Sequence, residues 1–338
     1  MNMCRGGILV KKDKLVEVKH LHTGFHIDGT YYDAISDINL EIREGEIMGV
    51  VGESGSGKSV LSMSLMKLLP EKIAEIKQGE ILYKGENIVE KSETEMNHYR
   101  GEEISMIFQE PMTSLNPVFT IGNQLIEMIK LHLKFSDKEA RNHAEGLLKK
   151  VGIPRADKVL NEYPHQLSGG MRQRVMIAMA ISCNPRLLIA DEPTTALDVT
   201  VQAQILELIK EVQRTNDMSV IFISHDLGVI AEVCDFVSVM YAGKIVESAK
   251  VDELFSNPKH PYTQLLLASI PKLDMNVERL ETIKGNVPGI KSLTHEGCRF
   301  ANRCPFVMDA CKSETPQTLE IEGNHEVACH LYQQAVKS

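Results

Sequence analysis

The stretch Gly52–Ser59 reads G-E-S-G-S-G-K-S, which fits the pattern G-x-x-x-x-G-K-[ST]. The apolar run Ile47–Val51 leads directly into it. Residues 60–66 follow, with apolar side chains at helical spacing. The predicted order is therefore strand, glycine-rich loop and helix. In that context the pattern is typical of a phosphate-binding loop, or P-loop.

The residue types of this loop suit phosphate chemistry. Its glycines allow the backbone to form a concave nest of N–H groups, and the helix N-terminus behind the nest adds partial positive charge. Lys58 can reach the β- and γ-phosphates, and the Ser59 hydroxyl can ligate Mg²⁺. A Gly/Ser-rich surface loop is the weaker interpretation, because a strand and a helix flank the motif. The predicted nucleotide-binding residues are Gly52, Glu53, Ser54, Gly55, Ser56, Gly57, Lys58, Ser59 and Val60.

The bulk properties indicate an ordinary globular chain. Its 338 residues allow about two domains at roughly 150 residues each. Apolar residues make up 43% of the chain, and the net charge of −9 argues against a nucleic-acid partner held through phosphate contacts. No apolar stretch approaches the ~18 residues of a membrane span, and the N-terminus lacks a hydrophobic signal core. We therefore expect the chain to stay in the cytoplasm.

Strands and helices are predicted to alternate between residues 15 and 256. The expected strands are Val16–His20, Ile38–Ile42, Glu80–Tyr83, Ile104–Phe108, Leu187–Ala190, Val220–Ile223 and Val237–Tyr241. The expected helices in the same part are Glu93–Arg100, Ser168–Asn184 and Val201–Thr215. Such alternation predicts an α/β fold in which helices cover a parallel sheet. Residues 1–14 are expected to be disordered, and Gly24–Asp33 is expected to form a loop.

Two further segments are predicted to be organised differently. Ile121–Leu133 and Lys138–Val151 carry apolar residues three and four apart, and Asp137 is the predicted N-cap of the second helix. We interpret residues 112–165, approximately, as a helical subdomain inserted into the α/β core. Residues 257–338, which begin with a proline-framed run, are predicted to form a small C-terminal domain.

Polar side chains close two of the predicted buried strands. Asp191 and Glu192 follow Leu187–Ala190, and His225 follows the strand that ends at Ile223. At the carboxyl edge of a parallel sheet, Asp191 is placed to hold Mg²⁺ through water and Glu192 to orient or deprotonate a water. A buried strand meeting a polar loop, and a structural histidine, are the alternatives. The P-loop upstream favours the catalytic interpretation.

The segment Ser168-Gly169-Gly170 precedes a long predicted helix. A hydroxyl and two glycines at a helix N-terminus make a second anion site, although an ordinary N-cap gives the same pattern. A second phosphate site in one chain needs either a second phosphate or a second copy of the chain.

Together these stretches resemble the ATPase subunit of ABC transporters over about residues 15–250. The resemblance implies a RecA-like P-loop NTPase core. It also implies that Gln109 is the Q-loop glutamine, which acts in catalysis and on Mg²⁺, and that His225 is the switch histidine. Asp198 belongs to the D-loop Ala196–Asp198 by the same resemblance. Members of the family stack adenine on an aromatic residue; the candidates are Phe25, Tyr31 and Tyr32, and Tyr31 is our assignment.

The same resemblance implies partners. In this family two ATPase subunits pair head to tail, so the signature segment Ser168–Gly170 of one subunit faces the γ-phosphate on the other. It also implies that the helical subdomain docks on two transmembrane permease subunits. The chain is then expected at the cytoplasmic face of the cell membrane, as a peripheral subunit.

A narrower resemblance is to the oligopeptide/dipeptide importer branch. It rests on the run from Asn257 to Pro271 with H-P-Y-T at its centre, on Gln109–Pro117, and on G-C-R-F-A-N-R-C-P at Gly297–Pro305. The branch often has prolines before the first tail cysteine, whereas this chain has Thr294–Glu296. The resemblance implies ATP-driven import of di- or oligopeptides, served indirectly by an extracytoplasmic peptide-binding protein.

Other importers and soluble ATPases are the alternatives to a peptide importer. A nickel or sugar importer of similar build is not separated from it by this sequence. A soluble ABC ATPase that acts on DNA or ribosomes is the other class, but the coiled-coil insertion or second ATPase domain of such proteins does not occur in these 338 residues.

Four of the seven cysteines lie in the tail: Cys298, Cys304, Cys311 and Cys329. Structural zinc favours paired C-x₂₋₄-C ligands, which are missing from this spacing, and disulfides are not expected in the cytoplasm. Four thiolates can also hold a [4Fe–4S] cluster, for which the importer branch is known, and four unligated buried cysteines are the remaining alternative. We predict the cluster. Because the P-loop lies in another predicted domain, ATP affinity is expected to survive loss of the cluster.

Overall fold

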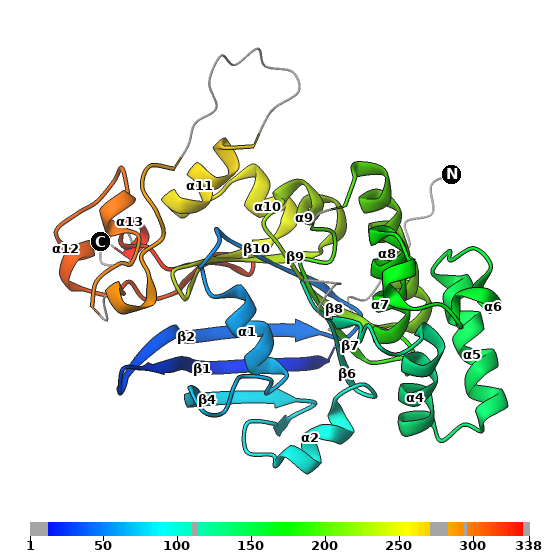
Figure 1. Ribbon diagram of the computed structural model, residues 1–338. Helices are drawn as coiled ribbons and strands as arrows, with labels where there is room; N and C mark the ends of the chain where they lie inside the picture. Colours follow the sequence, from blue (N-terminus) through cyan, green and yellow to red (C-terminus); the bar gives the residue numbers. More distant parts are fainter. Residues whose placement is uncertain (1–12, 110–113, 196, 271–282, 294–295, 334–338) are drawn as a thin grey trace, which may run out of the picture.

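The computed structural model describes residues 13–109, 114–195, 197–270, 283–293 and 296–333 (Figure 1). Two sheets form its frame. The larger sheet has the strand order β11 (Leu319–Glu322), β12 (His325–Val327), β10 (Lys244–Lys250), β9 (Phe236–Tyr241), β3 (Ile47–Val51), β8 (Ser219–Ser224), β7 (Leu187–Asp191) and β6 (Ile104–Ile107). The smaller sheet has the order β2 (Thr30–Arg43), β1 (Lys14–Ile27), β4 (Ala74–Tyr83) and β5 (Glu86–Asn87).

The larger sheet is mixed, not purely parallel as the sequence pattern predicts. From β6 to β9 every neighbouring pair is parallel, whereas β10, β12 and β11 pair antiparallel to their neighbours. All residues of β3, β7 and β8 are buried. Such strands at the centre of a parallel sheet read as continuous apolar runs, which is why these three were recognisable in the sequence.

The smaller sheet overturns one sequence-based expectation. Gly24–Asp33 does not form a loop, because β1 and β2 run through it and are joined by a tight turn at Asp28 and Gly29. Both turn residues have positive φ, 52° and 77°, which matches the twist of a hairpin. The polar residues near the turn lie on half-exposed antiparallel strands. β1 also begins at Lys14, inside the segment expected to be disordered; residues 1–12 lie outside the described part.

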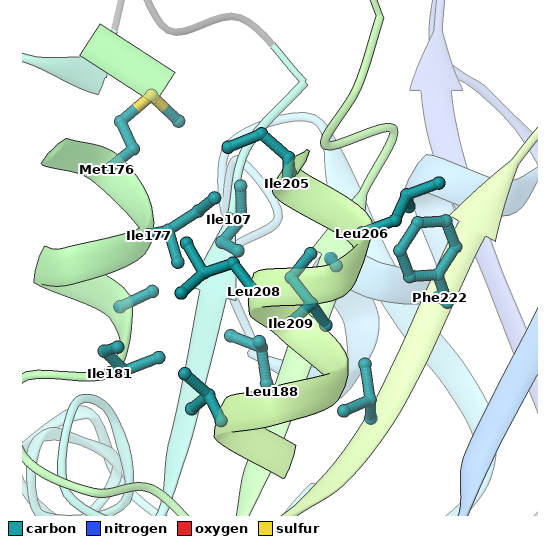
Figure 2. Close-up of a cluster of buried hydrophobic side chains, with 14 of the residues drawn as sticks. Ile107, Met176, Ile177, Ile181, Leu188, Ile205, Leu206, Leu208, Ile209 and Phe222 are labelled. Carbon is teal, nitrogen blue, oxygen red and sulfur yellow. The ribbon is translucent and has the colours of Figure 1, made fainter. Parts of the chain in front are cut away.

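Helices cover the larger sheet. On one face, α7 (Gly169–Ala180) and α8 (Val199–Asn216) pack on β6, β7 and β8 (Figure 2). Figure 2 shows Ile177, Leu188 and Leu208 in one apolar cluster between these elements. Further helices outside the inserted segment are α1 (Lys58–Leu65), α2 (Glu93–Tyr99), α9 (Leu227–Val233), α10 (Val251–Ser256), α12 (Ala310–Ser313) and α13 (His330–Gln333). Of the helices that the structure describes, none combines the length and apolar character that a membrane crossing requires.

The inserted segment is helical as expected. α4 spans Ile121–Leu133, α5 spans Asp137–Lys150, and the short α6 spans Ala156–Val159. The predicted N-cap of α5 is wrong by one residue. Ser136 caps this helix: its Oγ accepts from the Glu139 N–H, and the Glu139 carboxylate accepts from the Ser136 N–H in return. This reciprocal capping box satisfies two backbone donors, whereas Asp137 lies within the first turn.

The tail shares the larger sheet with the core. β12 pairs with β10, and a buried carboxylate fixes the junction: Glu247 of β10 accepts from Nε2 of His325 at 2.7 Å. Glu247 also accepts from the backbone N–H groups of Lys259 and His260, which lead into α11 (Pro261–Ala268). A charge with no exposed surface is stable only when it is well partnered, so the side chain of Glu247 binds three distant segments to one point.

Candidate nucleotide-binding site

The P-loop has a backbone that only glycine allows at two positions. Gly52 has φ of 156°, and a Cβ there would lie 2.2 Å from the carbonyl oxygen of Met240. Gly57 has φ of 103°, and a Cβ there would lie 2.7 Å from Ile35. The loop joins β3 to α1, and the N-cap position of α1 is Gly57, which offers no side chain to cap the helix. The N–H groups of the first turn are therefore available to an anion.

Lys58 folds back over the loop. Its Nζ donates to the carbonyl oxygens of Gly52 at 2.7 Å and Glu53 at 3.1 Å, and the residue is only 6% exposed. Burial lowers the pKa of Lys58, while the nearby carboxylates of Glu192, Asp191 and Glu53 act against this shift. A cation held by carbonyl oxygens in a concave loop is positioned for phosphate oxygens.

Asp191 ends β7 beside the start of α1. The Ser62 hydroxyl donates to Oδ2 of Asp191 at 3.2 Å, and Ser59 also hydrogen-bonds this carboxylate. Burial raises the pKa of Asp191, and its Oδ1 has less than 1 Å² of exposed surface and no hydrogen-bond donor among the described residues. A buried carboxylate oxygen next to a serine hydroxyl fits a hydrated Mg²⁺, because hard cations take oxygen ligands.

The three predicted catalytic residues meet at one oxygen. Oε2 of Glu192 accepts from Nε2 of Gln109 at 3.0 Å and lies 3.3 Å from Nδ1 of His225. Glu192 has a positive φ of 47°, and its N–H donates to the carbonyl oxygen of Ile223, the penultimate residue of β8. The ends of β7 and β8 therefore bring the carboxylate and the histidine together, as expected at this edge of the sheet.

Two further residues support this cluster, although no motif in the sequence marks them. Thr195 donates from Oγ1 to the same Oε2 of Glu192 at 2.9 Å, which fixes the carboxylate. Gln173 of α7 is buried, and its Nε2 donates to the carbonyl oxygen of Pro193. The signal in the sequence was polar residues around a buried strand end, but only the fold shows which of them face inward.

A cavity of about 480 Å³ opens over the P-loop. Its walls hold Ser54–Val60, Gln109 and Glu192. Phe25 lines the cavity, whereas Tyr31 does not: Lys77 lies 4.6 Å from the Tyr31 ring centroid, and His26 packs on its edge. One wall comes from the tail, through Val287, Pro288, Gly289, Ile290 and Leu293. No motif in the sequence indicates this wall.

The second predicted anion site does not face this cavity. In the described structure, Ser168, Gly169, Gly170 and Asp198 are not among the residues that line it. Figure 1 shows α7 and α1 well apart. Ser168 caps α7 by accepting from the Met171 N–H, and Asp198 caps α8 by accepting from the Val201 N–H. The chain alone therefore leaves these residues without a phosphate.

The tail cysteines gather in one region. The Cys298 N–H donates to the carbonyl oxygen of Cys311, and Cys311 and Cys329 are 7% and 8% exposed. Burial, together with a smaller contribution from the other tail cysteines, raises the pKa of Cys298 and Cys329 to about 11 each. Backbone N–H groups two residues on act in the opposite direction: Phe300 on Cys298, Phe306 on Cys304 and Leu331 on Cys329.

The described part of the chain contains no group of three or more His, Cys, Asp or Glu side chains arranged to hold a metal ion. The metal-cluster domain predicted from the sequence is therefore not shown.

Comparison with known proteins gives the class first. The profile of the family described as "ABC transporter" matches residues 35–195. The solved dimeric structure of "a post-hydrolysis state of the ATP-binding cassette MJ0796 bound to ADP and Pi" is 27% identical and superposes with a TM-score of 0.64, covering 70% of this chain and 98% of that one. The chain belongs to the ABC transporter ATPase family.

The tail narrows the class. The profile "Oligopeptide/dipeptide transporter, C-terminal region" matches residues 246–311. Over 320 residues, 95% of this chain and 97% of the relative, the chain is 50% identical to the oligopeptide transport ATP-binding protein AppD of Bacillus subtilis. The dipeptide transport ATP-binding protein DppD of the same organism is 49% identical, over 95% of this chain and 96% of that protein. Both predicted resemblances are confirmed.

Proposed function

We propose that this chain binds and hydrolyses ATP to drive the import of di- or oligopeptides by an ABC transporter. The observation that carries the proposal is one cavity whose walls join the P-loop to Gln109 and Glu192, with His225 beside Glu192. The relatives named above match this chain over nearly their whole length and are named oligopeptide and dipeptide transport ATP-binding proteins. Their names support peptides as the substrate.

The proposed roles follow from the contacts. Residues 52–60 wrap the phosphates, with Lys58 as the cation. Ser59, Asp191 and Gln109 would hold Mg²⁺, which would supply positive charge next to the phosphate oxygens. Glu192, fixed by Thr195, accepts a proton from the attacking water, and His225 donates toward the transferred phosphate. Phe25, rather than Tyr31, is the aromatic residue that we now propose for the adenine.

We propose a head-to-tail dimer of ATPase subunits. Ser168–Gly170 and Asp198 do not line the nucleotide cavity of their own chain. In the dimer they would contact the nucleotide that is bound to the second subunit. That partner is a copy of this chain or a related one. The similar cassette whose title calls it dimeric, bound to ADP and Pi, supports this arrangement.

A groove of about 240 Å³ is the proposed docking site of the permease subunits. It is apolar and lined by Met66, Leu68, Phe108, Leu115, Met128 and Met179. Leu68 and Phe108 are 36% and 42% exposed. The groove lies between the sheet and the helical insert, and Phe108 precedes Gln109 in the chain. A permease segment seated here touches the neighbour of the catalytic cluster, at the cytoplasmic face of the membrane.

Uptake by reconstituted vesicles tests the function. The chain is combined with its permease subunits, a partner ATPase and a peptide-binding protein, and ATP-driven uptake of labelled di- and pentapeptides is measured. We expect peptide uptake with the wild-type chain. Leu68→Glu should still bind Mg-ATP but lose co-purification and uptake, because a charge in the groove opposes an apolar partner. Ile73→Glu, which changes an apolar residue that is 50% exposed outside the groove, is the matched control.

Uptake of nickel or a sugar, with no uptake of peptides, would overturn the substrate assignment. Full uptake by the Leu68→Glu variant would overturn the docking surface and leave the substrate assignment in place.

For the tail, we propose that residues 257–338 act as a unit distinct in role from the ATPase part, residues 15–256. We further propose that Cys298, Cys304, Cys311 and Cys329 bind a [4Fe–4S] cluster. The other three tail cysteines all raise the pKa of Cys329, which indicates that the four thiols lie in one region, and four thiolates are the ligand set of such a cluster. Backbone N–H groups directed at three of the sulfurs stabilise thiolate ligands.

Metal analysis tests the cluster. Protein purified without oxygen should be brown and contain about four irons per chain. Cys304→Ser should lose iron, whereas Cys183→Ser, which changes a buried cysteine outside the tail, should keep it. Stoichiometric zinc without iron would contradict the assignment.

A further inference from the structure

Arg303 of the tail forms an ion pair with Glu53, the second residue of the P-loop. The guanidinium forks onto Glu53, with Nη1 donating to Oε2 at 2.7 Å and Nη2 to Oε1 at 3.0 Å. The Arg303 side chain is 6% exposed in this pair, and the Glu53 side chain is 27% exposed. The paired carboxylate raises the pKa of Arg303 still further above its usual value. A bidentate, largely buried pair fixes orientation as well as distance.

Other contacts prevent Arg303 from moving independently of the tail. Its Nε donates to the carbonyl oxygen of Lys284 at 2.9 Å, and its Nη2 donates to that of Gly285 at 3.1 Å. The guanidinium also lies over the ring of Tyr241, 5.6 Å from the centroid. Lys284 and Gly285 lead into Val287–Leu293, part of which forms the tail wall of the nucleotide cavity. Arg303 therefore ties that wall to the P-loop.

Glu53 does not line the cavity, so its influence on a nucleotide passes through its backbone. Its carbonyl oxygen accepts from Nζ of Lys58 at 3.1 Å and from the Ser56 N–H at 3.1 Å. Its N–H donates to the hydroxyl of Tyr262, a fully buried residue of the H-P-Y-T run. A shift of Glu53 therefore displaces the phosphate-binding lysine and the turn of the loop together.

A second arginine of the tail, Arg299, contacts the turn that is hydrogen-bonded to the P-loop. Arg299 donates to the carbonyl oxygen of Ala242 and, at 2.6 Å, to Oγ of Ser36. Gly243, the next residue after Ala242, donates its N–H to the carbonyl oxygen of Ser56 at 2.8 Å. Arg299 follows Cys298 in the chain and Arg303 precedes Cys304, so each of the two arginines is adjacent to a tail cysteine.

We propose that Arg303 and Arg299 are positioning residues that hold the P-loop in its phosphate-binding shape, so that the cysteine segment of the tail sets the affinity for ATP. The inference rests on the proposed ATP-binding function. It departs from the expectation that ATP affinity survives loss of the cluster, because two side chains of the segment 298–304 reach the loop and the turn beside it.

A double-mutant cycle on nucleotide affinity tests the contact between Arg303 and Glu53. The full chain is purified without oxygen, and the Kd for Mg-ATP is measured by calorimetry for the wild type, Arg303→Gln, Glu53→Gln and the double variant. Each single variant should weaken binding roughly tenfold, which is typical of a coupling between sites. The double variant should bind no more weakly than either single one, because both changes remove the same contact.

Controls separate positioning from loss of fold. Lys312→Gln breaks an exposed pair with Asp309 in the same tail and should leave the Kd unchanged. Arg303→Lys keeps the positive charge but loses the two-point contact with the Glu53 carboxylate. If Arg303→Gln folds poorly, Arg303→Lys takes its place in the test, and it should weaken ATP binding less than Arg303→Gln does. Iron content and the thermal midpoint are recorded for each variant.

Unchanged affinity in the folded single variants, or losses that add in the double variant, would overturn the inference alone. A wild-type chain that does not bind Mg-ATP would overturn the proposed function, and this inference with it.

Discussion

Glu192→Gln should bind ATP and barely hydrolyse it. In this variant the phosphate cradle, Lys58 and Asp191 are unchanged, while the carboxylate that meets Gln109, Thr195 and His225 becomes a neutral amide. An amide keeps an acceptor oxygen but does not take a proton from water. General-base catalysis contributes on the order of 10²–10⁴-fold, so phosphate release should fall by that factor. The Kd for Mg-ATP should stay close to that of the wild type.

The measurement compares steady-state phosphate release in the assembled transporter at saturating ATP with calorimetric binding by the same variant. Glu207→Gln, an exposed change on α8, is the matched control and should keep full turnover. Near-normal hydrolysis by Glu192→Gln would assign the base to another group, and a parallel loss of binding would mean that Glu192 shapes the cavity.

Lys58→Ala should fail at the preceding step. The change removes the only side-chain cation in the wall of the described cavity, together with its hydrogen bonds to the carbonyl oxygens of Gly52 and Glu53. Losing a buried, charge-assisted contact weakens binding strongly, here on the order of 100-fold in the Kd for Mg-ATP.

Calorimetry with Mg-ATP checks this prediction, with Lys72→Ala as the control because that lysine is exposed and away from the cavity. An unchanged Kd would mean that the loop does not bind phosphate. Together with Glu192→Gln, the result separates residues that hold the nucleotide from residues that act on water.

The sequence predicted the local parts of the site well. The P-loop, the carboxylate pair and His225 are short motifs attached to continuous apolar strands, and parallel strand ends meet at one edge of a sheet. That rule alone places Glu192 near His225, where the structure has them 3.3 Å apart. Gln109 followed from the family resemblance, and its bond to Glu192 is consistent with that.

Periodicity failed where strands are half exposed. The hairpin of β1 and β2 carries polar residues on its solvent side, so Gly24–Asp33 looked like a loop. The error affected the adenine assignment: Phe25 and Tyr31 lie on opposite strands of this hairpin, and only the register decides which ring reaches the cavity.

Long-range contacts could not be predicted from this single sequence. Arg303 and Glu53 are 250 residues apart, and nothing near either residue indicates the other. The same holds for the tail wall of the cavity, which depends on how Val287–Leu293 packs against the core. Both features depend on side-chain packing between segments that are far apart in the sequence and share no motif.

The pairing of β10 with β12 delays completion of the larger sheet until about 80 residues beyond β10 have been synthesised. Glu247 faces Val327 across these strands, a separation of 80 residues (327 − 247). Until the ribosome has released the C-terminal hairpin, one edge of β10 lacks its partner, and unpaired strand edges invite contact with other chains. A nascent chain that already contains every ATP-binding motif therefore still has an unpaired edge at β10. Chaperones and other unfolded chains compete to bind this edge.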